Sequence, residues 1–198
     1  QGYIEPHATT VRFDENGPSM IWCPTQGHFD VRASTARLLN MELGQIKVVA
    51  SEIGGGFGGK TTVYLEPVAL VLSRKAGRPV KMVMSRDEVF RASGPASASQ
   101  SRIKIGAKSD GTLTAVEASL YYEAGAFKGS PMAPGCMTVF TPYDVENMWV
   151  EGFDVVVNKA KVAAYRAPGA PQAEFAAEMV MNELAEKLAM DPIDLRLL

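Results

Sequence analysis

The sequence has few of the residues that bind metals or perform acid–base catalysis. Among its 198 residues are two cysteines and two histidines. Cys23 and Cys136 lie far apart with no CxxC partner, so this chain alone cannot form an iron–sulfur or zinc site. We expect both to be reduced core thiols of a cytoplasmic protein. His7 and His28 belong to no motif, and each is expected to be a surface or packing residue and not a catalytic base.

Long apolar runs and clusters of basic residues are also absent. No apolar run approaches the roughly 18 to 20 residues that cross a bilayer, which argues against a membrane protein. The net charge is −2 and no lysine or arginine cluster stands out, so nucleic acid is not an expected partner. The chain starts without a methionine or a signal peptide and stops within an expected helix. Both ends are therefore expected to continue in a longer polypeptide.

The first half of the chain alternates strand and helix patterns. Strands are expected at 19–24, 45–51 and 78–85, and helices at 29–43 and 66–77. Gly44 and Gly77 are expected to end the two helices, and Pro67 to begin the second. This local β-α-β-α-β order predicts a mixed sheet with some parallel pairing.

The second half has a different pattern. Two alternating runs over 97–125 flank Asp110-Gly111, the strongest short-range signal for an antiparallel hairpin. Further strand is expected at 151–165, and an irregular stretch rich in glycine and proline at 125–144. Helices are expected from Pro171 and from the Asp191-Pro192 cap. The fold class is therefore α+β, with a mixed sheet in the first half, an antiparallel hairpin in the second and helices at the C-terminus.

The sequence GGGFGGKT at 54–61 matches the nucleotide-binding pattern G-x-x-x-x-G-K-[ST]. A P-loop requires a helix that starts near Lys60 and continues. Pro67 would cost about 3 kcal/mol inside such a helix, so the helix is expected to begin at Glu66 instead. Asp87 is only a loose match to a Walker B carboxylate. A P-loop nucleotide-binding domain is therefore the alternative hypothesis, while the many glycines suggest a backbone that approaches a ligand closely.

Three stretches together resemble the molybdenum-binding large subunit of the xanthine oxidase and aldehyde oxidoreductase family. They are PTQGHFDVR at 24–32, GGGFGGK at 54–60 and AYRAPGAPQAEFAAEMVMNELAEKLAMDPIDLR at 164–196. YIEPH at 3–7 and GRPVKMVMSRDE at 77–88 are also similar to that family. The resemblance covers nearly the whole chain in the family order. It implies that residues 1–198 correspond to the first cofactor-binding domain of a longer catalytic subunit.

The resemblance implies a molybdenum–pterin cofactor, as molybdopterin or its cytosine dinucleotide form, with no direct protein ligand to the metal. Gln26 is expected to lie near the oxo ligand of the metal, where its amide N–H can donate. The backbone of Gly56, Phe57 and Gly58 is expected to line the cofactor, and Arg166 to lie at its edge. Taken singly, each residue favours a structural role: Gln26 a strand-end cap, Phe57 the core and Arg166 a surface ion pair. Their joint occurrence in family order favours the cofactor roles.

Three departures from the xanthine-oxidising members concern the substrate. Thr61 stands where those members carry a glutamate, Ala96 where they carry an arginine, and Pro168 where they carry an aromatic residue. A buried pocket for a purine needs polar partners and a stacking ring. We therefore expect an aldehyde, aromatic or N-heterocyclic substrate in place of xanthine, oxidised with water as the oxygen source.

Other parts of the family's machinery have no counterpart in these residues. Its general base is a glutamate in a glycine-rich motif near the C-terminus of the large subunit, so no catalytic residue is expected in this chain. The resemblance implies further partners: the remaining large-subunit domain and an iron–sulfur domain or subunit, with or without an FAD subunit. We expect the 198 residues alone neither to hold the cofactor tightly nor to turn over. A non-catalytic interaction module is the remaining alternative.

Overall fold

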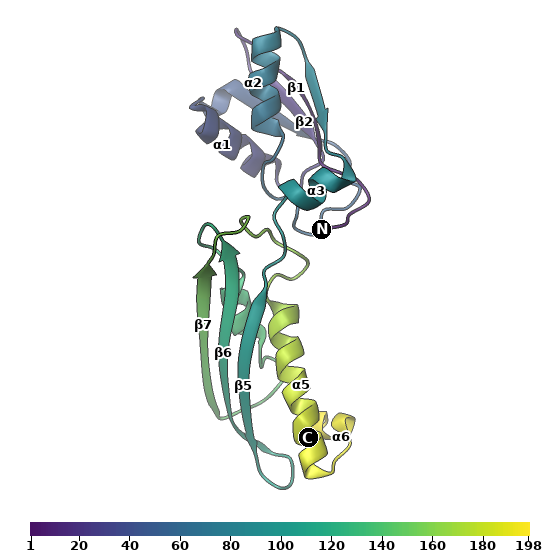
Figure 1. Ribbon diagram of the computed structural model, residues 1–198, viewed down its shortest axis with the longest axis vertical. Helices are drawn as coiled ribbons and strands as arrows, with labels where there is room; N and C mark the ends of the chain where they lie inside the picture. Colours follow the sequence, from purple (N-terminus) through teal and green to yellow (C-terminus); the bar gives the residue numbers. More distant parts are fainter. The chain divides into compact units, whose positions relative to one another are not determined.

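A computed structural model describes all of residues 1–198 as two compact units. Unit 1 comprises Gln1–Pro95 and Ala163–Arg166, and unit 2 comprises Ala96–Val162 and Ala167–Leu198. Each unit has its own sheet with helices packed against it (Figure 1). None of the helices has the length and apolar character needed to span a bilayer.

The sheet of unit 1 contains four short strands in the order β3-β2-β1-β4. The strands are β1 (Ala8–Arg12), β2 (Ser19–Cys23), β3 (Ile46–Ala50) and β4 (Val80–Val83). β2 and β3 are parallel, whereas β1 is antiparallel to both of its neighbours. The predicted mixed sheet is therefore confirmed, although the parallel pairing is limited to β2 and β3. β1 is an additional strand that the sequence pattern did not predict.

Three helices belong to unit 1: α1 (His28–Leu39), α2 (Glu66–Ala76) and α3 (Arg86–Ala92). α2 begins at Glu66 and is capped by Gly77, which has a φ of 63°, as the sequence predicted. The prediction that the first helix extends to residue 43 is wrong. α1 ends at Leu39 because Asn40 takes the left-handed conformation, with a φ of 51°, and its N–H caps the last turn. Gly44 lies instead in a short 3₁₀ turn at Leu43–Gln45.

The core of unit 1 lies between the sheet and one layer formed by α1 and α2. Its fully buried members come from β1, β2, β3 and both helices: Val11, Ile21, Cys23, Val31, Ala36, Ile46, Ala69 and Leu70. Burial, with the nearby Glu66 carboxylate, raises the pKa of the Cys23 thiol to about 12. Cys23 and Cys136 are both free thiols, as expected, but only Cys23 is fully buried.

The sheet of unit 2 contains three longer strands in the order β5-β6-β7. β5 (Ser99–Ala107) and β6 (Leu113–Gly125) form the predicted antiparallel hairpin. Gly111 occupies its turn with a φ of 94°, a conformation that glycine adopts without a steric penalty. β7 (Asn147–Val156) pairs in parallel with β6. β7 therefore begins before the predicted strand at 151–165 and ends well before residue 165.

The helices of unit 2 are α4 (Met132–Thr138), α5 (Ala170–Leu188) and α6 (Pro192–Arg196). The prediction of an irregular stretch throughout 125–144 is wrong, because α4 lies within it. Gly135 of this helix packs directly against the Tyr122 side chain, where there is no room for a Cβ. α5 begins next to Pro171 as predicted, and Asp191 caps α6 through the N–H groups of Ile193 and Asp194. The α+β class predicted from the sequence is confirmed.

Candidate functional site

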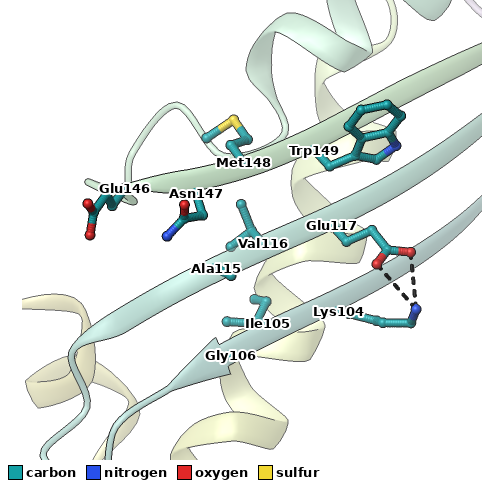
Figure 2. Close-up of a pocket in the computed structure, with 10 residues that line it drawn as sticks. All are labelled: Lys104, Ile105, Gly106, Ala115, Val116, Glu117, Glu146, Asn147, Met148 and Trp149. Carbon is teal, nitrogen blue, oxygen red and sulfur yellow. Dashed lines mark hydrogen bonds and ion pairs between the residues drawn. The ribbon is translucent and has the colours of Figure 1, made fainter.

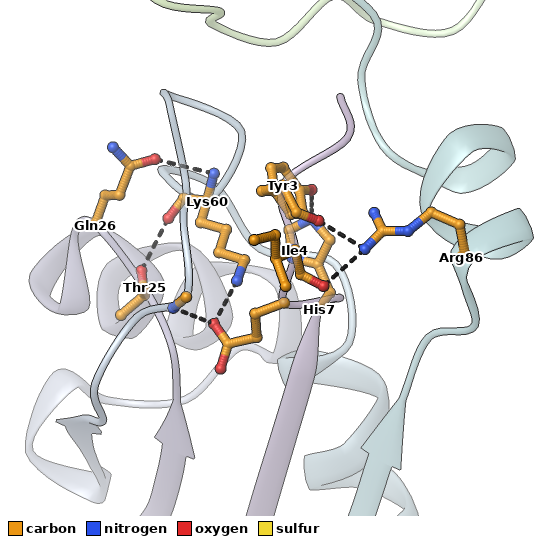
Figure 3. Close-up of polar contacts among 9 residues, drawn as sticks. Tyr3, Ile4, His7, Thr25, Gln26, Lys60 and Arg86 are labelled. Atoms are coloured by element: carbon orange, nitrogen blue, oxygen red, sulfur yellow. Dashed lines mark hydrogen bonds and ion pairs between the residues drawn. The ribbon is translucent and has the colours of Figure 1, made fainter.

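The glycine loop, defined as residues 54–61, connects β3 to α2 in unit 1. Three other parts of unit 1 contact it: residues 1–5, the turn at Gln26 and the returning segment Ala163–Arg166. Figure 3 shows the polar contacts that join the first two of these parts to the loop. The predicted cofactor residues of unit 1 are therefore brought together around a single loop.

Gln26 is fixed to the glycine loop by its own backbone and by one end of its side chain. Its N–H donates to the Lys60 carbonyl at 3.0 Å. Its Oε1 accepts from the Gly58 N–H at 2.8 Å and from the Lys60 N–H at 3.2 Å. Because these partners are donors, the side-chain oxygen must face the loop and the NH₂ group must face away from it. Gln26 is exposed, so this NH₂ group is free to donate to a group outside the chain.

Lys60 points into the protein and not toward a phosphate site. Its side chain is 1% exposed, and its Nζ lies 2.6 Å from the Glu5 carboxylate and 5.0 Å from the centre of the Tyr3 ring. α2 begins at Glu66, so no helix N-terminus stands beside Lys60. The Thr61 hydroxyl, which a P-loop would use for Mg²⁺, donates to the Gly58 carbonyl at 2.8 Å. The P-loop alternative therefore has no support in the geometry.

Two titratable groups beside Lys60 are strongly influenced by their surroundings. Burial would raise the pKa of Glu5, but hydrogen bonds from Lys60 and the Gly54 N–H outweigh burial and lower it. Burial lowers the pKa of His7 to about 4, and the positive charge of Lys60 acts in the same direction. His7 is 6% exposed, and its Nε2 lies 2.5 Å from the Tyr3 hydroxyl. It is therefore a neutral packing residue, whereas His28 lies exposed on the surface.

The glycines of the loop are required by contacts within unit 1. A Cβ at Gly54 would lie 2.6 Å from the Glu5 side chain, and one at Gly56 would lie 2.6 Å from Gln26 Oε1. A Cβ at Gly58 would lie 2.8 Å from the Cβ of Ala164. The sequence suggested that the glycines approach a ligand closely. The structure instead accounts for these three glycines by the approach of the chain's own side chains.

Phe57 and Arg166 are joined by a backbone hydrogen bond. The Arg166 N–H donates to the Phe57 carbonyl at 2.9 Å. Both residues have positive φ values, 50° for Phe57 and 27° for Arg166, which are uncommon for residues with side chains. Such conformations cost on the order of 1–3 kcal/mol and concentrate at functional sites. The Phe57 side chain is 51% exposed, so it is not a core residue.

The three predicted substrate-pocket residues are divided between the units. Thr61 is exposed in unit 1, whereas Ala96 and Pro168 lie in unit 2. Neither unit by itself therefore brings the three together. A pocket of about 720 Å³ lies on the strands of unit 2 and contains none of the predicted site residues. It is a depression on the exposed face of the sheet, with Trp149 and the Lys104–Glu117 ion pair beside it (Figure 2).

Comparison with known proteins identifies the chain. A family model described as "Molybdopterin cofactor-binding domain" matches residues 1–198. The chain belongs to this family. The match covers every residue of both units, including the glycine loop, Gln26 and Arg166. The predicted family and its molybdenum–pterin cofactor are therefore confirmed.

Relatives of this molybdopterin cofactor-binding domain include oxidoreductases with different named substrates. It is 34% identical to the nicotinate dehydrogenase large molybdopterin subunit of Eubacterium barkeri, over 99% of the chain and 47% of that protein. It is 31% identical to xanthine dehydrogenase/oxidase of Gallus gallus, over 98% of the chain and 15% of that protein. The solved aldehyde oxidoreductase of Desulfovibrio gigas superposes with a TM-score of 0.86 at 30% identity, over 98% of the chain and 22% of that structure. The domain thus spans less than half the length of each of these relatives.

The sequence did not predict the ion pair between Glu5 and Lys60: it gave Glu5 no role, and it considered the Lys60 side chain only as the lysine of a P-loop. Their ion pair joins positions 55 residues apart, so no local pattern predicts it. Both residues lie in segments that resemble the family, 3–7 and 54–60, but the resemblance assigned neither of them a role.

Proposed function

We propose that this chain is the first cofactor-binding domain of a longer molybdenum hydroxylase subunit. The match of residues 1–198 to the molybdopterin cofactor-binding family carries the proposal. The short share of each relative that the chain spans, 15% to 47% in the two sequence comparisons above, supports a position within a larger catalytic subunit. When bound, the molybdenum–pterin group would supply two-electron oxidation with oxygen taken from water.

In this proposal, Gln26 is the residue that donates to the cofactor. Its Oε1 is held by the Gly58 and Lys60 N–H groups, so its NH₂ group is oriented before any ligand binds. An amide NH₂ is a donor only, which suits an oxo ligand that can only accept. The residues therefore fit the cofactor that the family implies.

Gly56, Phe57, Gly58 and Arg166 would shape the remainder of the cofactor surface. The Gly58 N–H already donates to Gln26, and its carbonyl accepts from Thr61, so Gly58 would act by holding these two side chains. Gly56 would leave room for Gln26. The exposed Phe57 side chain would exclude water from one side of the group, while Arg166 would present its charge at the edge.

We further propose that the substrate is an aldehyde, an aromatic compound or an N-heterocycle other than xanthine. Thr61, Ala96 and Pro168 offer neither the charged groups nor the aromatic ring that would bind a purine. The Thr61 hydroxyl is also occupied by the Gly58 carbonyl, which leaves it less available to a substrate. A site that lacks the polar partners of a substrate loses much of its preference for it.

Measurements on the full-length enzyme can test the substrate class. Nicotinate, an aromatic aldehyde and xanthine would each be assayed with a dye as electron acceptor and with ¹⁸O-labelled water. We expect ¹⁸O in the product, and kcat/KM for the preferred substrate at least about 100-fold above that for xanthine. Xanthine turnover at a comparable rate would refute the substrate proposal, and product without ¹⁸O would refute the reaction class.

Gln26→Ala tests the cofactor role, with Gln100→Ala on an exposed position of β5 as the matched control. Loss of a donor placed at the reacting group typically lowers kcat by about 100-fold. We expect this loss for Gln26→Ala and unchanged kinetics for Gln100→Ala. Equal rates for the two variants would refute the role of Gln26.

The remaining parts of the enzyme are also proposals. The catalytic glutamate, the second half of the cofactor cradle and the iron–sulfur centre would lie in other domains or subunits, with an FAD subunit in some assemblies. Two free thiols support a reducing, cytoplasmic location. The isolated 198 residues should bind no stoichiometric molybdenum. Elemental analysis that found one molybdenum per chain would contradict this expectation.

A further inference from the structure

One carboxylate holds both ends of the glycine loop. At the start of the loop, the Gly54 N–H donates to Glu5 Oε2 at 2.8 Å. At its end, Lys60 Nζ donates to the same oxygen at 2.6 Å. The Glu5 N–H also donates to the Gly54 carbonyl at 3.1 Å. Gly54 and Lys60 are separated by five residues, and the Glu5 side chain links them by binding both.

Lys60 connects the Glu5 contact to Gln26 through its own backbone. Its backbone N–H donates to Gln26 Oε1 at 3.2 Å, and its carbonyl accepts from the Gln26 N–H at 3.0 Å. The Thr25 hydroxyl donates to the same carbonyl at 3.1 Å. The Lys60 side chain thus contacts Glu5 while its backbone contacts Gln26 (Figure 3). A movement of Lys60 away from Glu5 would also move its N–H, which holds Gln26 Oε1, and its carbonyl, which accepts from the Gln26 backbone N–H.

The conformation of the glycine loop depends on the negative charge of Glu5, because Lys60 is buried beside it. The Lys60 side chain is 1% exposed, and Glu5 is the carboxylate with which it forms an ion pair. A buried ammonium that loses its partner must become solvated or lose its proton, and either change disturbs the structure around it. Arg86 holds the residues before Glu5 in place, since its Nη2 donates to the carbonyls of Tyr3 and Ile4 at 2.6 and 2.9 Å.

We infer that Glu5 is a positioning residue of the cofactor site. It acts through Lys60 to fix the glycine loop, and so aims the NH₂ group of Gln26 at the cofactor. This inference rests on the proposed function. It also makes a separate claim about the loop itself, which can be measured whether or not the protein carries a cofactor.

The test uses the full-length protein with Glu5→Gln, Lys60→Met and the double variant. Glu5→Gln keeps an acceptor for Gly54 but removes the charge that Lys60 needs. Glu117→Gln is the matched control, because it breaks an exposed Lys104–Glu117 pair of 3.1 Å in unit 2. The first readout is amide hydrogen exchange of peptides that cover residues 54–60. The second is the electron paramagnetic resonance spectrum of the partly reduced holoenzyme, compared with that of Gln26→Ala.

We expect Glu5→Gln to increase exchange across the loop at least about tenfold, because a buried ammonium that loses its carboxylate partner opens the structure locally. The double variant should recover part of this change, since it no longer buries an unpaired charge. The spectrum of Glu5→Gln should shift in the same direction as that of Gln26→Ala. Glu117→Gln should match the wild type in both measurements.

Two results would overturn the inference. Wild-type exchange in Glu5→Gln would show that the carboxylate does not hold the loop. Faster exchange with an unchanged spectrum would show that Glu5 stabilises the loop without positioning Gln26. If Glu5→Gln does not fold, the double variant carries the same comparison. A wild-type protein without molybdenum would refute the proposed function, while the exchange experiment would still decide whether Glu5 closes the loop.

Discussion

The buried His7 should make the stability of unit 1 depend on pH in a predictable way. Burial and the positive charge of Lys60 lower the His7 pKa from 6.5 to about 4. Between these values the unfolded chain binds a proton that the folded chain does not. Acidification from pH 6.5 to pH 4 therefore favours unfolding. The difference in pKa corresponds to about 3 kcal/mol of unfolding free energy, which is fully present above pH 6.5.

The contribution of His7 can be separated from that of other groups by comparison with His7→Gln. Glu5 has a lowered pKa, so it also stabilises the fold above its unfolded pKa and loses that contribution on acidification. It remains in both proteins and largely cancels in the difference. The unfolding free energies of wild type and His7→Gln should therefore differ by about 3 kcal/mol less at pH 4 than at pH 7.5. His28→Gln, at the other histidine, is the matched control and should give a curve parallel to that of the wild type.

Urea denaturation at a series of pH values provides the measurement. Trp22 lies in unit 1 and Trp149 in unit 2, so a Trp149→Phe background leaves a fluorescence signal from unit 1 alone. A constant difference between wild type and His7→Gln across this pH range would refute the reasoning, because it would mean that His7 titrates alike in the folded and unfolded chains.

Three further changes have expected outcomes. Gly58→Ala should destabilise unit 1 by about 1–3 kcal/mol in urea, because its φ is 94° and a Cβ would meet Ala164 at 2.8 Å; Gly77→Ala has open space around the new Cβ and should cost no more than about 1 kcal/mol. Ser85→Ala should cost about 1 kcal/mol, since its hydroxyl accepts an N–H at the start of α3; an unchanged urea midpoint would contradict the cap. The Cys23 thiol should react with iodoacetamide at least about 100-fold more slowly in the folded protein than in urea, and equal rates measured by peptide mass spectrometry would contradict its burial.

Much of the fold could be predicted because many of its elements have local signals. Asp110-Gly111 identified the hairpin, and Pro67 and Gly77 identified the ends of α2. α3 also had a local signal, the capping box formed by Ser85 and Glu88, which was not used. β1 had none. It is stabilised by pairing with strands from distant parts of the chain, and this pairing cannot be inferred from five residues.

The site was predicted less completely than the fold. The resemblance placed Gln26 and the glycine loop in one site, and the structure brings them into direct contact. It could not show that Gln26 presents its NH₂ group outward, because that orientation depends on two N–H groups of a folded loop. The Glu5–Lys60 pair was missed for a related reason. Each residue alone is an ordinary surface charge, and only the closed loop buries the lysine.

The return of the chain to unit 1 at Ala163–Arg166 has a consequence for the order of folding. Gln1 Nε2 donates to the Ala164 carbonyl at 2.5 Å, a contact across 163 positions of the sequence. Contacts of such long range form late, because a large loop must close before they contribute. During synthesis, the sheet of unit 1 can form well before residue 164 leaves the ribosome, whereas the glycine loop receives its last support only afterwards. We therefore expect the surface around Gln26 to be the last part of unit 1 to become ordered.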